Sequence, residues 1–70
     1  LIVKTLEVVG FSEKAYHEYG RNYAYLEKLG KMTSEIDLMI ASICLANNMT
    51  LVTNNKKDFE NIPNLRLMIW

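Results

Sequence analysis

A helical stretch and the strand that closely follows it constrain the fold of this 70-residue chain more than any other feature. Residues 34–46 form a run of mostly apolar residues with a carboxylate, Asp37, in the first turn. Shortly afterwards Thr50-Leu51-Val52-Thr53 is typical of a short buried strand, and Asn54-Asn55 of a turn after it. This order places Asp37 near a helix N-terminus and Asn55 beyond the end of a strand, where open α/β sheets build their sites.

The other elements predict an α/β fold. Strands are expected at residues 6–9 and 65–70, one helical turn at residues 57–61, and a helix from the N-cap Ser12 to the C-cap Gly30. The helix over residues 34–46 is expected to be capped by Thr33 or Ser34 and to end at Asn47-Asn48. The order of strand, helix, helix, strand, turn and strand favours a mostly parallel sheet covered by helices. Apolar side chains recur at helical spacing in two stripes. The stripe of the first helix contains Ala15, Tyr16, Tyr19, Tyr23, Leu26 and Leu29, and its tyrosines are expected to face the core or an interface. The stripe of the second helix is expected to face the core and contains Ile36, Met39, Ile40, Ile43 and Cys44.

Composition excludes several classes of protein. Eight basic and eight acidic side chains cancel, so any contact with RNA is expected to be local. The single cysteine, Cys44, is expected to be a buried structural thiol. No apolar run reaches the ~20 residues of a membrane span, and no signal peptide opens the chain, which predicts a soluble cytoplasmic protein without a membrane partner. The first residues, Leu1-Ile2-Val3, indicate a fragment cut from a hydrophobic element.

Asp37 is the first candidate for chemistry. Its spacing leaves two interpretations open: it is a ligand for a hard cation such as magnesium, or it simply faces the free N–H groups and the dipole of its helix. Thr53 and Asn55 offer a hydroxyl and an amide beyond a strand, a pattern that is equally typical of an ordinary turn. Asp58 and Glu60 belong to a mixed-charge turn and are expected to be solvated.

Taken together, these segments resemble the C-terminal half of a PIN domain, the fold of the VapC-type ribonuclease toxins. The resemblance covers nearly the whole chain, and the sequences that carry it are Leu6-Glu7-Val8-Val9, Leu29-Gly30, Ile36-Asp37-Leu38-Met39-Ile40-Ala41, Leu51-Val52-Thr53-Asn54-Asn55, Asp58-Phe59, Ile62-Pro63-Asn64-Leu65 and Trp70. It implies a three-layer α/β fold with a mostly parallel sheet. Residues 1–70 would be its C-terminal portion, with the N-terminal half absent.

The resemblance also implies a function, namely that of a metal-dependent endoribonuclease toxin from a type II toxin–antitoxin pair. Acidic residues of such enzymes hold magnesium or manganese, and water attacks the phosphodiester. Asp37 would match a metal ligand, and Thr53 and Asn55 would match the polar catalytic residues after the next strand. The family's first two acidic residues lie on an opening strand and an early helix, which have no counterpart here, so the chain is expected to be inactive alone. Its implied partners are RNA, a cognate antitoxin and a second copy of itself.

Two other interpretations stay open at this point. The chain is a non-catalytic, partner-binding remnant of such a toxin, or it is a generic piece of a doubly wound α/β protein. The sequence contains no Gly-rich phosphate loop, which weighs against the generic piece.

Overall fold

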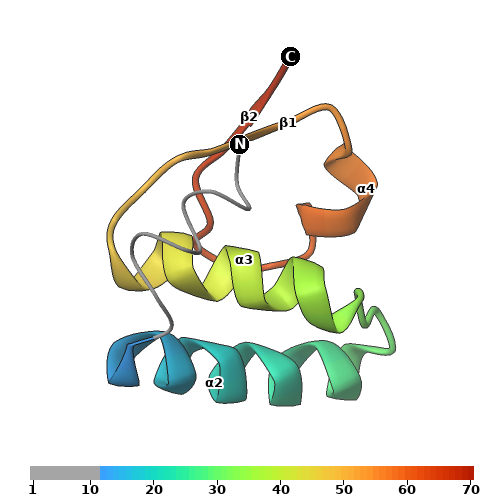
Figure 1. Ribbon diagram of the computed structural model, residues 1–70. Coiled ribbons are helices and arrows are strands. Elements are labelled where there is room, and N and C mark those ends of the chain that lie inside the picture. The colour runs from blue at the N-terminus through green and yellow to red at the C-terminus, as the bar shows by residue number, and fades with distance from the viewer. Residues whose placement is uncertain (1–11) are drawn as a thin grey trace.

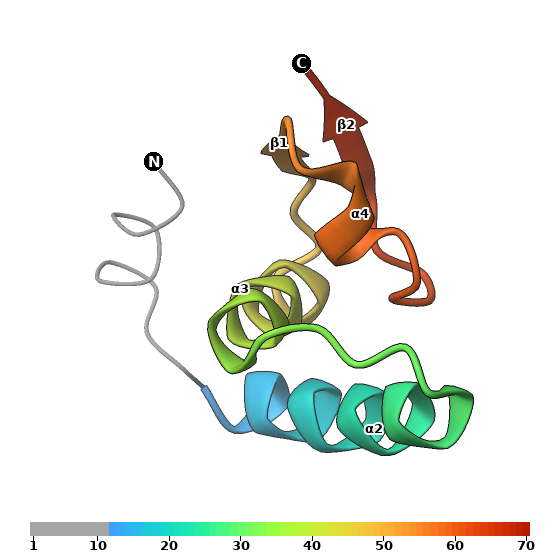
Figure 2. The ribbon, with the colours of Figure 1, turned by 90° about the vertical axis from the view of Figure 1, so that its right-hand side faces the viewer.

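A computed structural model describes residues 12–70, so the strand expected at residues 6–9 lies outside the described residues. The elements within them are α2 (Glu13–Leu29), α3 (Glu35–Ala46), β1 (Leu51–Thr53), α4 (Lys56–Phe59) and β2 (Leu67–Ile69). Figures 1 and 2 show α3 lying between α2 on one side and α4 with the two strands on the other. The order and type of these elements confirm the α/β prediction.

The ends of both long helices are fixed by short polar side chains and by left-handed residues. The hydroxyl of Ser12 accepts a hydrogen bond from the Ala15 N–H at 3.2 Å, which caps the N-terminus of α2. Gly30 ends α2 in the left-handed conformation, with φ of 72°. After α3 the chain turns through Asn47 and Asn48, and Asn48 has φ of 58°. All of these boundaries agree with the sequence-based prediction.

Helix α3 is buried on nearly all sides. Five of its residues expose 2% or less of their surface: Leu38, Ala41, Ser42, Ile43 and Cys44. The hydroxyl of Ser42 donates to the Leu38 carbonyl at 2.6 Å, so this polar group is satisfied within the core. The prediction that Ile36 belongs to the core was wrong, because this residue lies in the first turn and is 61% exposed.

The buried face of α2 is also turned away from the predicted stripe. Ala15, Asn22 and Leu26 are the buried residues of this helix, whereas Tyr16 is 65% exposed. Tyr23 and Leu29 are exposed as well. Small or short side chains allow α2 to approach α3, and tyrosines keep their hydroxyl groups near water. The side-chain amide of Asn22 donates to the Glu18 carbonyl at 2.8 Å, which satisfies its burial.

The two strands pair in parallel, as the sequence predicted. Leu51 lies opposite Leu67, and Val52 lies opposite Met68. Leu51 faces the core, which also contains Phe59 of α4 and Ile62, whereas Val52 and Met68 are 42% and 58% exposed on the outer face. Among residues 12–70, no helix is long and apolar enough to span a bilayer.

The burial of α3 predicts different costs for two truncations. Leu38→Ala is expected to lower the free energy of unfolding by about 2–5 kcal/mol, because it leaves a cavity in the core. Ile36→Ala, two residues away on the exposed first turn, is expected to change it by less than about 0.5 kcal/mol. Urea denaturation followed by circular dichroism measures both, and equal losses would contradict the assignment of the buried face.

The buried thiol of Cys44 predicts a loss of stability at alkaline pH. Burial raises the pKa of this thiol above its ordinary value. Below the pKa of an exposed thiol, about 8.5, both states hold the proton; above it, the unfolded chain loses the proton first and folding becomes less favourable. Between about pH 7 and about pH 10 the chain should therefore lose more stability than Cys44→Ala does. Equal losses in urea denaturation would show that the thiol does not contribute.

Candidate functional site

The N-terminus of α3 holds Asp37 in place without using its carboxylate. The hydroxyl of Ser34 accepts a hydrogen bond from the Asp37 N–H at 3.1 Å, and the Ser34 carbonyl accepts one from Leu38 at 3.0 Å. Ser34 therefore fills the capping role that one interpretation assigned to Asp37. The half-buried Asp37 side chain lines a pocket instead.

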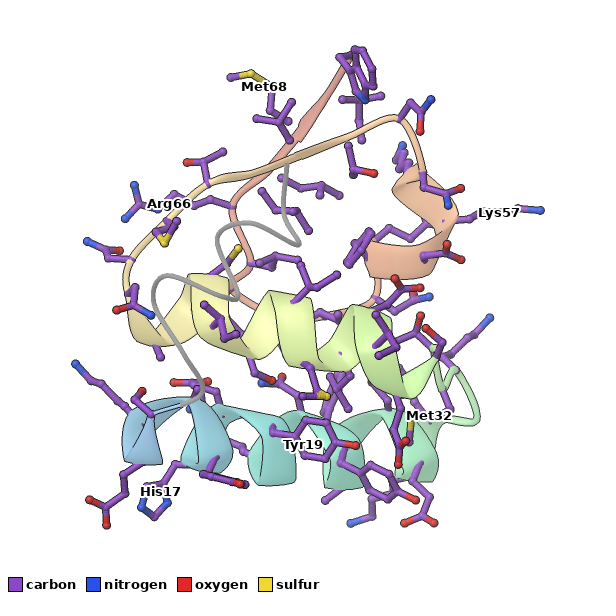
Figure 3. All side chains as sticks on the ribbon, in the orientation of Figure 1. His17, Tyr19, Met32, Lys57, Arg66 and Met68 are labelled. Atoms are coloured by element: carbon purple, nitrogen blue, oxygen red, sulfur yellow. The ribbon has the colours of Figure 1, made fainter. Side chains whose placement is uncertain are left out.

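This pocket has a volume of about 480 Å³ and lies where the start of α3 meets α4. Besides Asp37, its charged walls are Asp58 and Lys57 of α4, and Lys31 from the segment that joins α2 to α3. Figure 3 shows Lys57 and Met32, another lining residue, on the same side of the molecule. Two carboxylates and two ammonium groups balance, so the pocket has no net charge of its own.

Asp58 is the residue that sequence reasoning missed. It was expected to be solvated, but it is half-buried and shares the pocket with Asp37. The next residue, Phe59, is 5% exposed and fixes α4 against the core, which turns Asp58 toward the start of α3. The signal in the sequence was the pairing of a carboxylate with a core aromatic residue in a single helical turn.

Thr53 and Asn55 shape the turn that leads into α4. The hydroxyl of Thr53 accepts a hydrogen bond from the Asn55 N–H at 3.0 Å, and the Asn55 carbonyl accepts one from Asp58 at 3.2 Å. The residues lining the Asp37 pocket include neither Thr53 nor Asn55. Their hydrogen bonds position α4, and through it Lys57 and Asp58, beside Asp37. A direct catalytic role for the two residues stays a prediction.

The pocket offers oxygen ligands of the type that magnesium and manganese prefer, but it offers only a small number of them. Carboxylates and amide oxygens, here Asp37, Asp58 and Asn61, are the ligands that hard cations prefer. Within residues 12–70, no group of three or more histidine, cysteine or acidic side chains is arranged to hold a metal ion. The described residues therefore bring too few anionic side chains together to hold such a cation by themselves.

A second set of side chains lies on the exposed side of α2 and α3. The Tyr19 and Tyr23 rings stack with centroids 6.1 Å apart. Partial burial, and then the nearby Glu35 carboxylate, raise the pKa of the Tyr19 phenol, so it remains protonated at neutral pH. These rings offer apolar surface and do not supply a nucleophile.

Comparison with known proteins gives a consistent result. No protein-family model matches the sequence. Over all 70 residues the chain is 44% identical to Ribonuclease VapC2 of Rickettsia felis and covers 52% of that protein. It is 32% identical over 68 residues to the tRNA(fMet)-specific endonuclease VapC of Salmonella typhimurium, covering 97% of this chain and 52% of the relative.

A solved structure extends the comparison to three dimensions. The crystal structure of VapBC2 from Rickettsia felis bound to a DNA fragment from their promoter matches 86% of this chain and 45% of its own chain. The TM-score is 0.81 and the sequence identity 48%. The parallel strands, the helices that cover them and this match define an α/β protein of the PIN-domain class. Within that class the chain is similar over nearly its whole length to the VapC ribonucleases, and it spans about half the length of the curated relatives it matches.

The separate roles of Ser34 and Asp37 predict different effects on stability. Ser34→Ala is expected to lower the free energy of unfolding by about 1 kcal/mol, because it removes the cap of α3. Asp37→Asn is expected to cost at most about 0.3–1 kcal/mol, the contribution of a carboxylate near the helix dipole. Thermal denaturation of both variants measures the difference. A larger loss in Asp37→Asn would make Asp37 a structural residue.

Proposed function

We propose that this chain forms part of a metal-dependent endoribonuclease toxin from a toxin–antitoxin pair, and that residues 1–70 do not cleave RNA alone. The observation that carries the proposal is the position of Asp37 in this chain, all 70 residues of which align with a VapC ribonuclease at 44% identity. Asp37 lines a pocket together with a second carboxylate, Asp58, while Ser34 fills its capping role. Such a carboxylate is available for a cation.

Each group around the pocket has a role in this proposal. Asp37, with Asp58, would hold magnesium or manganese, which when bound neutralises charge that develops on phosphate oxygens and favours attack by water. Lys31 and Lys57 attract the phosphate backbone of RNA. Thr53 and Asn55 hold the turn before α4, and Asn55 adds no charge to the metal site.

A non-catalytic, partner-binding role is the second candidate, and one observation favours it. The part of the chain that the structure describes brings two carboxylates to the pocket, and no third acidic, histidine or cysteine ligand. Two carboxylates with two lysines beside them bind a divalent cation weakly, because the lysines offset their charge. The isolated chain would then act through its surfaces.

Partners of the proposed toxin follow from its relatives. One solved relative is a VapBC2 complex, so the proposal includes an antitoxin as a protein partner. The proposal also includes self-association, because Val52 and Met68 on the outer face of the sheet, and Trp70 just after β2, are exposed to solvent. RNA is the proposed substrate, as in the relatives whose names record a ribonuclease or a tRNA-specific endonuclease.

A chimeric protein tests the catalytic proposal. The chain would replace the matching half of Rickettsia felis VapC2, which restores a protein of full length. With magnesium or manganese, this chimera should cleave a pool of RNA that includes tRNAs, and Asp37→Asn should reduce the rate at least about 100-fold. Gel electrophoresis of end-labelled RNA measures the cleavage. Glu60→Gln, an exposed carboxylate of the same turn as Asp58, serves as the matched control and should retain the rate.

Titration calorimetry of the isolated chain separates the two candidates further. The 70 residues alone should bind magnesium weakly or not measurably. Tight, stoichiometric binding that disappears in Asp37→Asn would contradict the proposed incompleteness of the site. A folded chimera that does not cleave RNA under any of these conditions would leave the partner-binding role as the better explanation.

A further inference from the structure

A second pocket lies at the other end of α3 and gathers both arginines of the chain. It has a volume of about 220 Å³. Arg21 belongs to α2, and Arg66 belongs to the segment just before β2, 45 positions later in the sequence. No other arginine occurs in the 70 residues. Figure 3 shows Arg66 on the opposite side of the view from Lys57, which lines the Asp37 pocket.

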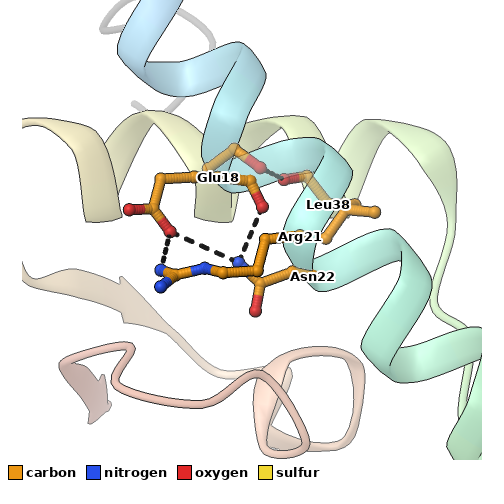
Figure 4. Close-up of polar contacts among 5 residues, drawn as sticks. Glu18, Arg21, Asn22 and Leu38 are labelled. Atoms are coloured by element: carbon orange, nitrogen blue, oxygen red, sulfur yellow. Dashed lines mark hydrogen bonds and ion pairs between the residues drawn. The ribbon is translucent and has the colours of Figure 1, made fainter.

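Each guanidinium group is held in place by a polar partner. Figure 4 shows the Glu18 carboxylate joined to the Arg21 guanidinium, with which it forms an ion pair. The buried Asn22 side-chain amide also donates to the Glu18 carboxylate at 3.5 Å and to the Glu18 backbone carbonyl at 2.8 Å. The Arg21 side chain is still 63% exposed, so most of its N–H donors remain open to a ligand.

The backbone also positions Arg66. Its carbonyl accepts a hydrogen bond from the N–H of the buried Leu51 at 2.8 Å, and its guanidinium donates to the side-chain oxygen of Asn48. Asn48 and Asn64 both line this pocket, and they are the two non-glycine residues with positive φ among residues 12–70. Such conformations are uncommon outside glycine and gather at ligand sites.

The charge and the floor of the pocket suit an anion. Two arginines and one glutamate leave one net positive charge. Cys44, Leu45 and Met49 supply the apolar part of its lining and carry no charge that would repel an anion. Burial raises the pKa of the Cys44 thiol, so the thiol stays neutral at neutral pH and does not repel an anion.

We infer that the pocket between Arg21 and Arg66 binds a phosphate group, and that in RNA it holds a backbone phosphate at a distance from the bond that is cleaved. Two guanidinium groups line the same pocket, and a guanidinium group matches the geometry of phosphate oxygens. The RNA part of this inference rests on the proposed function. Asp37 and Cys44, one in each pocket, are seven residues apart on α3, or about 10 Å along its axis.

Binding experiments with inorganic phosphate test the site itself. Addition of phosphate to the 70-residue chain should shift the NMR signals of the Arg21 and Arg66 side chains, while the same ionic strength of sodium chloride should not. Arg21→Gln and Arg66→Gln should each weaken phosphate binding at least about tenfold, since each removes hydrogen bonds to a charged group. Glu18→Gln should strengthen it, because the one negative charge of the pocket is removed.

A matched control separates a built site from general attraction. Lys28→Gln removes one positive charge from an exposed position on the same helix as Arg21 and should leave phosphate binding unchanged. Equal losses in Lys28→Gln and Arg21→Gln would overturn the inference. So would weaker binding in Glu18→Gln. Circular dichroism confirms that each variant is folded before it is compared.

A short, fluorescently labelled oligouridylate extends the test to RNA. Its affinity should fall with salt, and Arg66→Gln should reduce the slope of log K against log salt concentration by about 0.7, the value for one lost phosphate contact on a single strand. The two proposals fail separately. A chimera that cleaves RNA, with a slope unaffected by Arg66→Gln, would overturn this inference alone. Arginine-dependent binding without cleavage would support it and overturn the nuclease proposal alone.

Discussion

The burial of α3 is the constraint on which the rest of the described structure depends. A helix whose side chains are hidden on nearly every side needs a partner on each side, and α2 and the layer of α4 and strands supply them. Both pockets follow from this arrangement. The first residues of α3 meet α4 at the Asp37 pocket, and the last turn meets Arg66 at the other. One rigid helix therefore sets the separation of the two candidate sites.

Local sequence signals predicted the elements well because their causes are local. The cap at Ser12, the cap at Thr33 or Ser34, the helix ends at Gly30 and Asn47-Asn48, and the strand over residues 50–53 all depend on neighbours within a few residues. The structure selects Ser34 as the cap and starts the strand at Leu51. The rotation of each helix about its axis depends instead on its packing partner. The sequence therefore misplaced Ile36 into the core and overlooked Asn22, a buried polar residue whose side-chain amide bonds to its own helix.

The candidate site shows the same division between local and tertiary causes. The sequence identified Asp37 from its place in the first turn of an apolar helix, but it did not identify Asp58, which lines the same pocket. Asp58 reaches the pocket because Phe59 fixes α4 in the core, a tertiary contact that spacing alone does not reveal. Thr53 and Asn55 were predicted as site residues because they follow a strand. In the structure this position makes them form the hydrogen-bonded turn before α4. The arginine pocket joins residues too far apart in sequence for any motif to record.

The two-stranded sheet has apolar residues on both of its faces. Leu51 and Leu67 point inward, while Val52 and Met68, their neighbours along the strands, point outward. A slip of one strand by a single residue would exchange inner for outer side chains at little cost in hydrophobicity. The alignment of the strands therefore depends on directional bonds at their two ends, from Leu51 N–H to the Arg66 carbonyl and from Trp70 N–H to the Thr53 carbonyl. In so short a pair of strands, the backbone hydrogen bonds at the two ends set the register, and the hydrophobic side chains do not.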